Sequence, residues 1–156
     1  MKIRTARLTL LELSLEHLQL MLDSPDMLEA QLGTPVSRTN LQGPVQRALR
    51  MKIERMQGED PANHPWSTYW LIITPNPSFG AGMAGFKGAP DENGAVEIGY
   101  GIDPICQGQG YMTEAVRALI EWAFGHPACQ TVTARGVLRT NLASQHVLVN
   151  AGMEQY

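Results

Sequence analysis

The sequence predicts a mixed α/β domain in which a mostly antiparallel sheet is flanked by helices. Residues 95–124 are typical of a strand, a glycine-rich turn and an amphipathic helix. Residues 69–87 predict two apolar strands joined by a proline-bearing turn, which would pair with the strand at 95–102 as an antiparallel meander. At 156 residues, the chain is long enough to bury the core of one such domain.

The composition is that of a globular protein without a strong charge of one sign. Hydrophobic residues make up 44% of the chain and charged residues 17%, and the net charge is −3. This balance gives no basic field for nucleic acid, and no apolar run approaches the length of a membrane span. Because the N-terminus also lacks a signal-peptide pattern, we expect a cytoplasmic protein that binds no membrane. Cys106 and Cys129 are too few and too isolated to indicate disulfides or a metal site.

The first forty residues predict a strand, a capped helix and a loop. Residues 3–13 alternate apolar and polar side chains and then become more apolar, which predicts one opening strand. Ser14 is suited to cap the helix that follows. The apolar face of this helix comprises Leu15, Leu18, Met21 and Leu22. Turn residues dominate positions 23–42, where we expect a loop.

A second long helix is expected from Pro44, because proline suits the first position of a helix. Its apolar face comprises Val45, Ala48, Leu49, Ile53 and Met56. The charged residues of this helix are interpreted as solvated surface. Residues 57–66 are polar and contain proline, which indicates a loop before the strands at 69–74 and 79–87.

The central strand and helix follow from two different periods. Val96, Ile98 and Tyr100 alternate with polar residues and glycines, as in a strand, and Pro104 ends that strand. Apolar residues then recur at three- and four-residue spacing up to Phe124, which predicts a helix that begins at the glycines.

The turn between this strand and helix is suited to hold an anion. Gly108 and Gly110 bracket Gln109, so the backbone can turn sharply and present N–H groups where the helix begins. Free N–H groups and the helix dipole both attract phosphate, although a plain structural turn also explains a glycine pair. Tyr111 and Met112 replace the Lys-Ser or Lys-Thr pair of a Walker loop, and a dinucleotide-binding loop would need a third glycine. Neither of those two loops is therefore expected.

The remaining residues predict one more strand and a last helix. Residues 131–137 alternate apolar and polar side chains. Asn141 is suited to cap a helix over 141–153, with Val147 and Leu148 in its core face and Gly152 ending it in a left-handed conformation.

Several segments, in the same order along the chain, resemble the GCN5-related N-acetyltransferases. The turn Ile105-Cys106-Gln107-Gly108-Gln109-Gly110 resembles the phosphate loop of that family, Q/R-x-x-G-x-G/A, with Ile105 in place of Gln or Arg. Residues 141–153 resemble the pattern N-x-A-S-x-x-V-L-x-x-x-G-F of the Rim-type branch, which acetylates the N-termini of ribosomal proteins; Met153 replaces Phe. Residues 3–10 resemble the first strand of that branch.

The resemblance implies a single N-acetyltransferase domain over residues 1–156, with a sheet whose central parallel strand pair splays apart. Family members normally continue beyond the last helix into two further strands, and the sequence stops at Tyr156 before them. We therefore expect a covered sheet edge, through a strand from a second protomer in a homodimer or through a natural C-terminus beyond residue 156.

The function implied by the resemblance is transfer of an acetyl group from acetyl-CoA to a primary amine by direct attack in a ternary complex. The pyrophosphate would be held by backbone N–H groups of the turn, that is, of Gln107, Gly108, Gln109, Gly110, Tyr111 and Met112. The pantetheine arm would lie along the strand edge formed by Tyr100, Gly101 and Ile102, and Tyr100 would also line the acetyl pocket. Asn141, beside its role as a cap, would contact the cofactor.

Two residues are candidates for the proton transfers that the resemblance implies. Glu97 lies where family members often have a glutamate, and it would act as general base directly or through a water. An ion pair with a neighbouring arginine is the alternative explanation for Glu97. Ser144 matches the serine of N-x-A-S and would be the general acid, although an ordinary helix hydroxyl would look the same in the sequence.

The sequence does not identify the acceptor, because protein N-termini, lysine side chains, polyamines and aminoglycosides all carry a primary amine. A second class of function is also open. The same fold can bind an acyl-CoA without transferring it, as a catalytically inactive sensor or assembly module.

Overall fold

The computed structural model describes residues 1–39, 41, 43–134, 147–149 and 152–153. They form a six-stranded sheet in the order β1-β2-β3-β4-β5-β6, in which only the β5–β6 pair is parallel. The strands are β1 (Lys2–Arg4), β2 (Thr9–Glu12), β3 (Trp70–Thr74), β4 (Phe79–Phe86), β5 (Ala95–Ile102) and β6 (Thr131–Thr133). The predicted mixed and mostly antiparallel sheet is confirmed.

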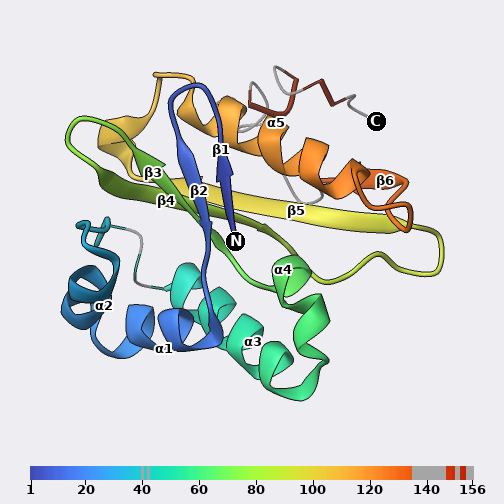
Figure 1. Cartoon of the computed structure of the whole chain (residues 1–156), viewed down its shortest axis with the longest axis horizontal. Coiled ribbons are helices and arrows are strands. Elements are labelled where there is room, and N and C mark those ends of the chain that lie inside the picture. The colour runs from blue at the N-terminus through green and yellow to red at the C-terminus, as the bar shows by residue number, and fades with distance from the viewer. Residues whose placement is uncertain (40, 42, 135–146, 150–151, 154–156) are drawn as a thin grey trace.

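Helices cover both faces of this sheet (Figure 1). Helix α5 (Tyr111–Phe124) lies on one face. The other face carries α1 (Leu15–Asp23), α2 (Pro25–Leu32) and α3 (Pro44–Gly58). The short α4 (His64–Ser67) follows α3, and its Trp66 packs with the buried cluster on the α5 side. Each face has its own buried cluster, one that includes Leu10, Phe86 and Leu119, and one that includes Leu18 and Leu49.

The opening segment is a hairpin, so the prediction of one strand over residues 3–13 is wrong. β1 and β2 pair in antiparallel fashion, with Ile3 opposite Leu10. Thr5 closes the turn between them: its backbone N–H donates to the carbonyl of Leu8 at 3.0 Å, and its hydroxyl accepts from the Leu8 N–H at 3.0 Å. The alternating pattern could not reveal this turn, because the hydrogen bonds of a threonine side chain create it.

Two segments that the sequence indicated as loops contain helices. α2 lies within positions 23–42: it begins at Pro25, buries Leu28 and ends at Gly33, whose φ of 69° is left-handed. The segment 57–66 contains the 3₁₀ helix η1 (Pro61–Asn63) and the start of α4, which buries Trp66 against Trp122 of α5 at a centroid distance of 4.6 Å. In each of these helices a proline stands in the first turn, where it is tolerated, so proline was a poor signal of a loop.

The other predicted elements are confirmed where the structure describes them. α1 begins after Ser14, whose hydroxyl accepts from the N–H of His17 at 3.1 Å, and α3 begins at Pro44. β3, β4 and β5 form the expected meander. Residues 147–149 are helical and Gly152 has a φ of 92°, as expected for the end of the last helix. Positions 135–137 of the strand expected at 131–137 lie outside the described residues.

The pairing of β5 explains where a ligand can approach. β6 pairs only with the first part of β5, from Ala95 opposite Thr131 to Glu97 opposite Thr133. The rest of β5 has no partner in the described part of β6, and it leads into the 3₁₀ helix η2 (Pro104–Cys106) and the glycine turn. Among the described residues, this end of β5 is paired with β4 and lies beside the start of α5.

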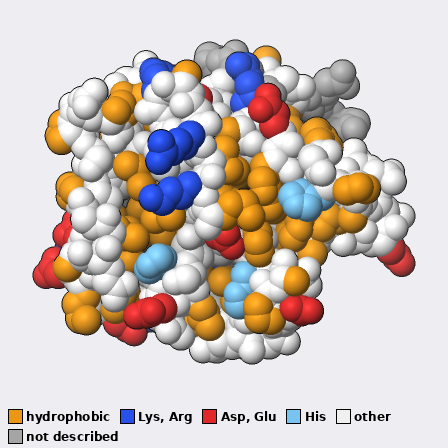
Figure 2. Space-filling view, in the orientation of Figure 1, with side chains coloured by type: hydrophobic (Ala, Val, Ile, Leu, Met, Phe, Trp, Pro, Cys, Tyr) orange, Lys and Arg blue, Asp and Glu red, His pale blue; other side chains and the backbone are white. Residues whose placement is uncertain are grey.

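The molecular surface mixes apolar and charged side chains. In the orientation of Figure 1, hydrophobic side chains spread across the middle of the face, while Lys and Arg side chains gather in its upper half (Figure 2). Among the helices that the structure describes, none has the length and apolar character needed to cross a bilayer.

Candidate active site

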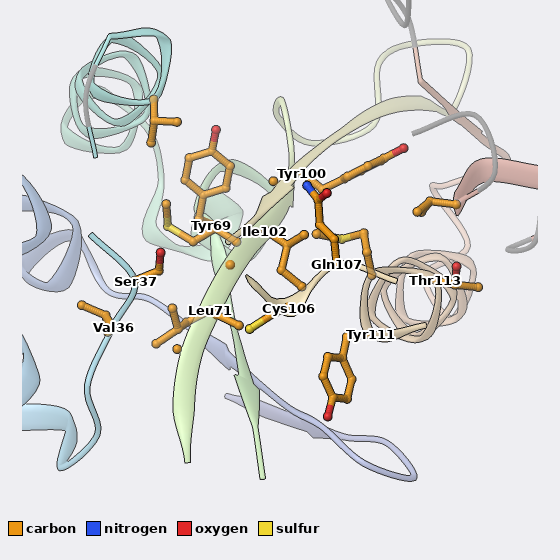
Figure 3. A pocket seen from close by; sticks show the side chains of 18 of the residues that line it. Val36, Ser37, Tyr69, Leu71, Tyr100, Ile102, Cys106, Gln107, Tyr111 and Thr113 are labelled. Atoms are coloured by element: carbon orange, nitrogen blue, oxygen red, sulfur yellow. The ribbon is translucent and has the colours of Figure 1, made fainter. Parts of the chain in front are cut away.

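A cavity of about 720 Å³ opens beside the end of β5 and the glycine turn (Figure 3). On one side it is bounded by β5, the turn and α5, through Tyr100, Gly101, Ile102, Cys106, Gln107, Gly108, Gly110, Tyr111, Met112 and Thr113, which we call the turn wall. On the opposite side lie side chains of α1, α3, β3 and β4 and of the segments before α3 and β3. They are Met21, Val36, Ser37, Leu41, Val45, Tyr69, Leu71 and Met83, which we call the helix wall. Eight of the ten described residues predicted to bind the cofactor or to catalyse therefore line one cavity.

The glycine turn presents its backbone to this cavity. Gly108 and Gly110 both have a φ of 78°, a left-handed conformation that side chains rarely adopt. A Cβ atom at Gly108 would have no neighbour within 4 Å, so the space beside this backbone is open. The N–H of Glu114 donates to the carbonyl of Gly110 at 3.1 Å, whereas the three helical residues before it have no acceptor within their own helix. Their N–H groups and the helix dipole suit an anion.

Arg7, in the turn of the β1–β2 hairpin, is hydrogen-bonded to the glycine turn at Gln109, a residue that does not line the cavity. Its Nη1 donates to the carbonyl of Gln109 at 2.8 Å, and its Nε donates to Oε1 of Glu114 at 2.8 Å. The guanidinium also lies 4.6 Å from the centre of the Tyr111 ring. Gln109 is thus tied to Arg7, and it is the one predicted turn residue between 107 and 112 that does not line the cavity.

The carboxylate of Glu114 fixes the position of Arg7 through further hydrogen bonds. It accepts from the backbone N–H of Arg7 at 2.9 Å and from the hydroxyl of Thr5. Burial alone would raise the pKa of the Glu114 carboxyl, but the hydrogen bonds from Thr5 and Arg7 outweigh it and lower the pKa. The ionised carboxylate therefore keeps the guanidinium against the turn.

Asp103 connects the helix wall to the end of β5. Its Oδ2 accepts from the hydroxyls of Ser37 at 2.7 Å and Thr39 at 3.1 Å, and its Oδ1 accepts from the N–H of Ile105 at 3.0 Å. The hydrogen bond from Ser37, followed by that from Ile105, lowers the pKa of the Asp103 carboxyl. One carboxylate thus fastens positions 37–39 to the beginning of the glycine turn.

Glu97, the predicted base, lies in the middle of β5 and does not line the cavity. Its Oε2 pairs with Nζ of Lys87 at 2.9 Å, so the neighbouring cation is a lysine and not the arginine considered from the sequence. Gly101, on the same face of β5, lies four residues further along, which is about 13 Å in an extended strand. A proton could pass from the cavity to Glu97 only through intervening water.

Asn141 and Ser144 lie outside the described residues, and their predicted roles stay predictions. Val147, further along the same predicted helix, lines the cavity. Cys106 lines it as well, but burial, together with the charge of Asp103, raises the pKa of its thiol, so Cys106 is not activated as a nucleophile. Within the described part of the chain, no group of three His, Cys, Asp or Glu side chains is placed to hold a metal ion.

Sequence reasoning missed Arg7 and Asp103. The partners of Arg7 are 102 and 107 residues away in the chain, so no local pattern could reveal them. Asp103 offered a signal, because an Asp before Pro104 at a strand end is suited to accept from the next turn, as it does from Ile105. Ile105 itself is 79% exposed, so its departure from the family pattern lies on the surface.

The sequence matches the acetyltransferase (GNAT) domain family over residues 7–154, and the chain therefore belongs to this family. Among curated proteins, the uncharacterized N-acetyltransferase YjdG of Bacillus subtilis (strain 168) is 37% identical over 83 residues. The match covers 53% of this chain and 49% of that protein, so the chain spans about half the length of this relative.

Solved structures share the fold at low sequence identity. An acetyltransferase of the GNAT family from Bacillus anthracis gives a TM-score of 0.63 at 17% identity, covering 99% of this chain and 84% of that one. A ribosomal L7/L12 alpha-N-protein acetyltransferase in complex with coenzyme A gives a TM-score of 0.65 at 20% identity, covering 97% and 83%. The predicted fold and the resemblance to this family are both confirmed.

Proposed function

We propose that this protein transfers the acetyl group of acetyl-CoA to a primary amine. The observation that carries the proposal is the turn wall, where Gly108 leaves open space beside the N-terminus of α5. Free helix N–H groups in that position suit the pyrophosphate of coenzyme A. A protein of the same fold, the ribosomal L7/L12 acetyltransferase, was crystallised with coenzyme A, which supports the same ligand here.

The end of β5 would align the pantetheine arm. A Cβ at Gly101 would meet no atom within 4 Å, so an extended chain can approach the backbone there. Tyr100 and Ile102 flank this glycine and line the same cavity. When bound, acetyl-CoA supplies an acyl group that is activated as a thioester.

The proposed chemistry is a direct transfer in a ternary complex. The amine nitrogen attacks the thioester carbonyl carbon and forms a C–N bond, the C–S bond breaks, and the departing thiolate takes up a proton. An alkylamine with a pKa of about 10 is protonated at neutral pH and must lose a proton before attack. In the proposal Glu97 receives that proton through water and Ser144 donates the proton to the thiolate.

The proposal predicts that Gly108→Asp abolishes binding of acetyl-CoA, because it adds bulk and negative charge beside the pyrophosphate. Gly33→Asp is the matched control: Gly33 also has a left-handed φ, 69°, and open space at its Cβ, but it does not line the cavity. Calorimetry with coenzyme A and a thiol-release assay with a panel of amines measure the two steps. Unchanged affinity in a folded Gly108→Asp variant would remove the turn from the site.

The pairing of Glu97 with Lys87, away from the cavity, favours a second candidate function, namely binding of an acyl-CoA without transfer. The two functions differ in one measurement. A binding module binds coenzyme A and releases no thiol with any amine, whereas a transferase releases one thiol for each amide formed. The homodimer expected from the sequence stays a prediction that sedimentation tests.

A further inference from the structure

The helix wall is the side of the cavity that faces the turn wall, and none of its described residues carries a charge. Six of these residues are aliphatic or methionine, and the polar groups are the hydroxyls of Ser37 and Tyr69. Figure 3 shows Val36, Ser37, Tyr69 and Leu71 on the side of the cavity opposite Tyr111 and Thr113. If acetyl-CoA occupies the turn wall, an acceptor that enters the same cavity from the opposite side contacts this apolar wall.

Two charged groups that contact residues of this wall, Asp103 at Ser37 and Lys52 at Tyr69, already have hydrogen-bond partners. The Asp103 carboxylate accepts from two hydroxyls and one backbone N–H. Nζ of Lys52 lies 4.4 Å from the centre of the Tyr69 ring and donates to the carbonyls of Phe86 at 2.8 Å and Ser67 at 3.0 Å. The carboxylate of Asp103 is therefore already hydrogen-bonded, and Lys52 adds no negative charge to this wall.

These conditions discriminate between classes of amine. A second ammonium group on the acceptor would lose its hydration against this wall and find no carboxylate among the described residues that line the cavity. An alkyl or aryl group has no charge whose hydration could be lost, and its transfer from water to an apolar wall is favourable. An apolar site also favours the neutral form of the reacting amine, which is the form that attacks.

We propose that the helix wall selects primary monoamines whose substituent is apolar, and that it rejects polyamines and aminoglycosides. This inference rests on the proposed acetyl transfer. A free alkylamine and a peptide whose first residue has an apolar side chain offer the same chemistry to the wall.

The first test compares two amines of equal length. The kcat/KM of n-pentylamine is expected to exceed that of 1,5-diaminopentane by about tenfold or more at neutral pH, because only the diamine carries a second ammonium group. The tripeptide amides Leu-Gly-Gly and Lys-Gly-Gly repeat the comparison for N-termini, with Leu-Gly-Gly expected to react faster. Whichever of pentylamine and Leu-Gly-Gly has the higher kcat/KM identifies the source of the acceptor.

A substitution at Val45 tests whether the helix wall causes the preference for pentylamine over diaminopentane. Val45 is the second residue of α3 and lines the cavity, and a carboxylate in the first turn of a helix is favourable to the fold. Val45→Glu is expected to reduce the ratio of kcat/KM for pentylamine to that for diaminopentane by about tenfold. Gln46→Glu adds the same charge to the same turn at a residue that does not line the cavity, and it should leave the ratio unchanged.

Failure of the inference can be told apart from failure of the proposed function. If amides form but diaminopentane reacts as well as pentylamine, or if Gln46→Glu changes the ratio as much as Val45→Glu, the inference is overturned while acetyl transfer stands. If no amine in the panel is acetylated, acetyl transfer itself is overturned, and the inference falls with it.

Discussion

At the residue scale, Glu97 is either the general base or one half of a structural ion pair. Its carboxylate pairs with Lys87 at 2.9 Å and lies outside the cavity lining, so a role in catalysis and a role in holding the sheet predict different mutant behaviour. As a general base, Glu97→Gln should lower kcat by about 10²-fold at neutral pH. The loss should shrink as the pH approaches the pKa of the acceptor, since the free amine then accumulates. Rate profiles against pH for both proteins measure this.

Lys87→Met is the control for that prediction, because it breaks the same ion pair but leaves the carboxylate in place. A base at position 97 predicts that Lys87→Met retains most of the activity. Equal losses in the two variants, with a ratio to wild type that does not change with pH, would make the ion pair structural and leave deprotonation of the amine to the apolar wall.

The residues of the site differ in how far the sequence could predict them. Gly108 and Gly110 could be predicted, because a left-handed turn before a helix leaves a local signature in two glycines. Arg7 could not, because its role comes from contacts with Gln109 and Glu114 that exist only after the hairpin packs on α5. A local backbone conformation can be predicted from a short stretch of sequence, whereas a hydrogen bond between distant segments is visible only in the folded structure.

At the scale of elements, Lys52 links α3 to both β4 and α4. Nζ of Lys52 donates to two backbone carbonyls, those of Phe86 and Ser67. Burial, aided by the nearby charges of Arg55 and Lys87, lowers the pKa of Lys52 to about 7. The unfolded chain, where a lysine has a pKa of about 10.4, then holds more protons than the folded one between about pH 7 and 10. This lysine therefore lowers stability most at low pH.

Lys52→Met should remove that dependence. In urea unfolding at about pH 7, 8 and 9, the free energy of unfolding of the wild type relative to Lys52→Met is expected to rise with pH, by at most about 1.4 kcal/mol per pH unit. Lys2→Met, at an exposed lysine of β1, controls for the loss of a positive charge. A difference that stays constant over this range would mean that Lys52 keeps its proton in the folded protein.

Which elements the sequence could predict follows from how each one is stabilised. α3 and α5 have long apolar faces, and β5 alternates apolar side chains with polar residues and glycines, so their periodicity predicted them. β3 is a continuous apolar run and β4 a glycine-rich one, and the turn residues around them marked both as strands. α2 and α4 are short and begin at or beside prolines, and their helical state depends on burying Leu28 and Trp66 against the rest of the fold. The period of a pattern predicts an element only when the element is long enough to show it.

For the whole molecule, the cavity lies between elements that belong to the two faces of the sheet, and in the proposal acceptor and cofactor meet there. The turn wall belongs to β5 and α5, whereas the helix wall comes from the opposite face and from β3 and β4. Asp103 joins the two walls through Ser37, Thr39 and Ile105. A ligand that orders one wall should therefore affect the other, which is a coupling free energy between the two binding sites.

Asp103→Asn is expected to weaken this coupling, because an amide accepts less strongly than a carboxylate and a charged hydrogen bond contributes about 1.5–3 kcal/mol. The affinity for coenzyme A, measured by calorimetry with and without saturating pentylamine, should respond about tenfold less to the amine in this variant. Asp26→Asn is the control, since its exposed carboxylate holds Arg38 of the same segment at 2.8 Å without touching β5. Because the folded-state pKa of Asp103 is lowered, its stabilising effect is present above the unfolded pKa of about 3.9 and is lost as the pH falls below it. Equal coupling in the wild type and in Asp103→Asn at neutral pH would show that the two walls bind their ligands independently.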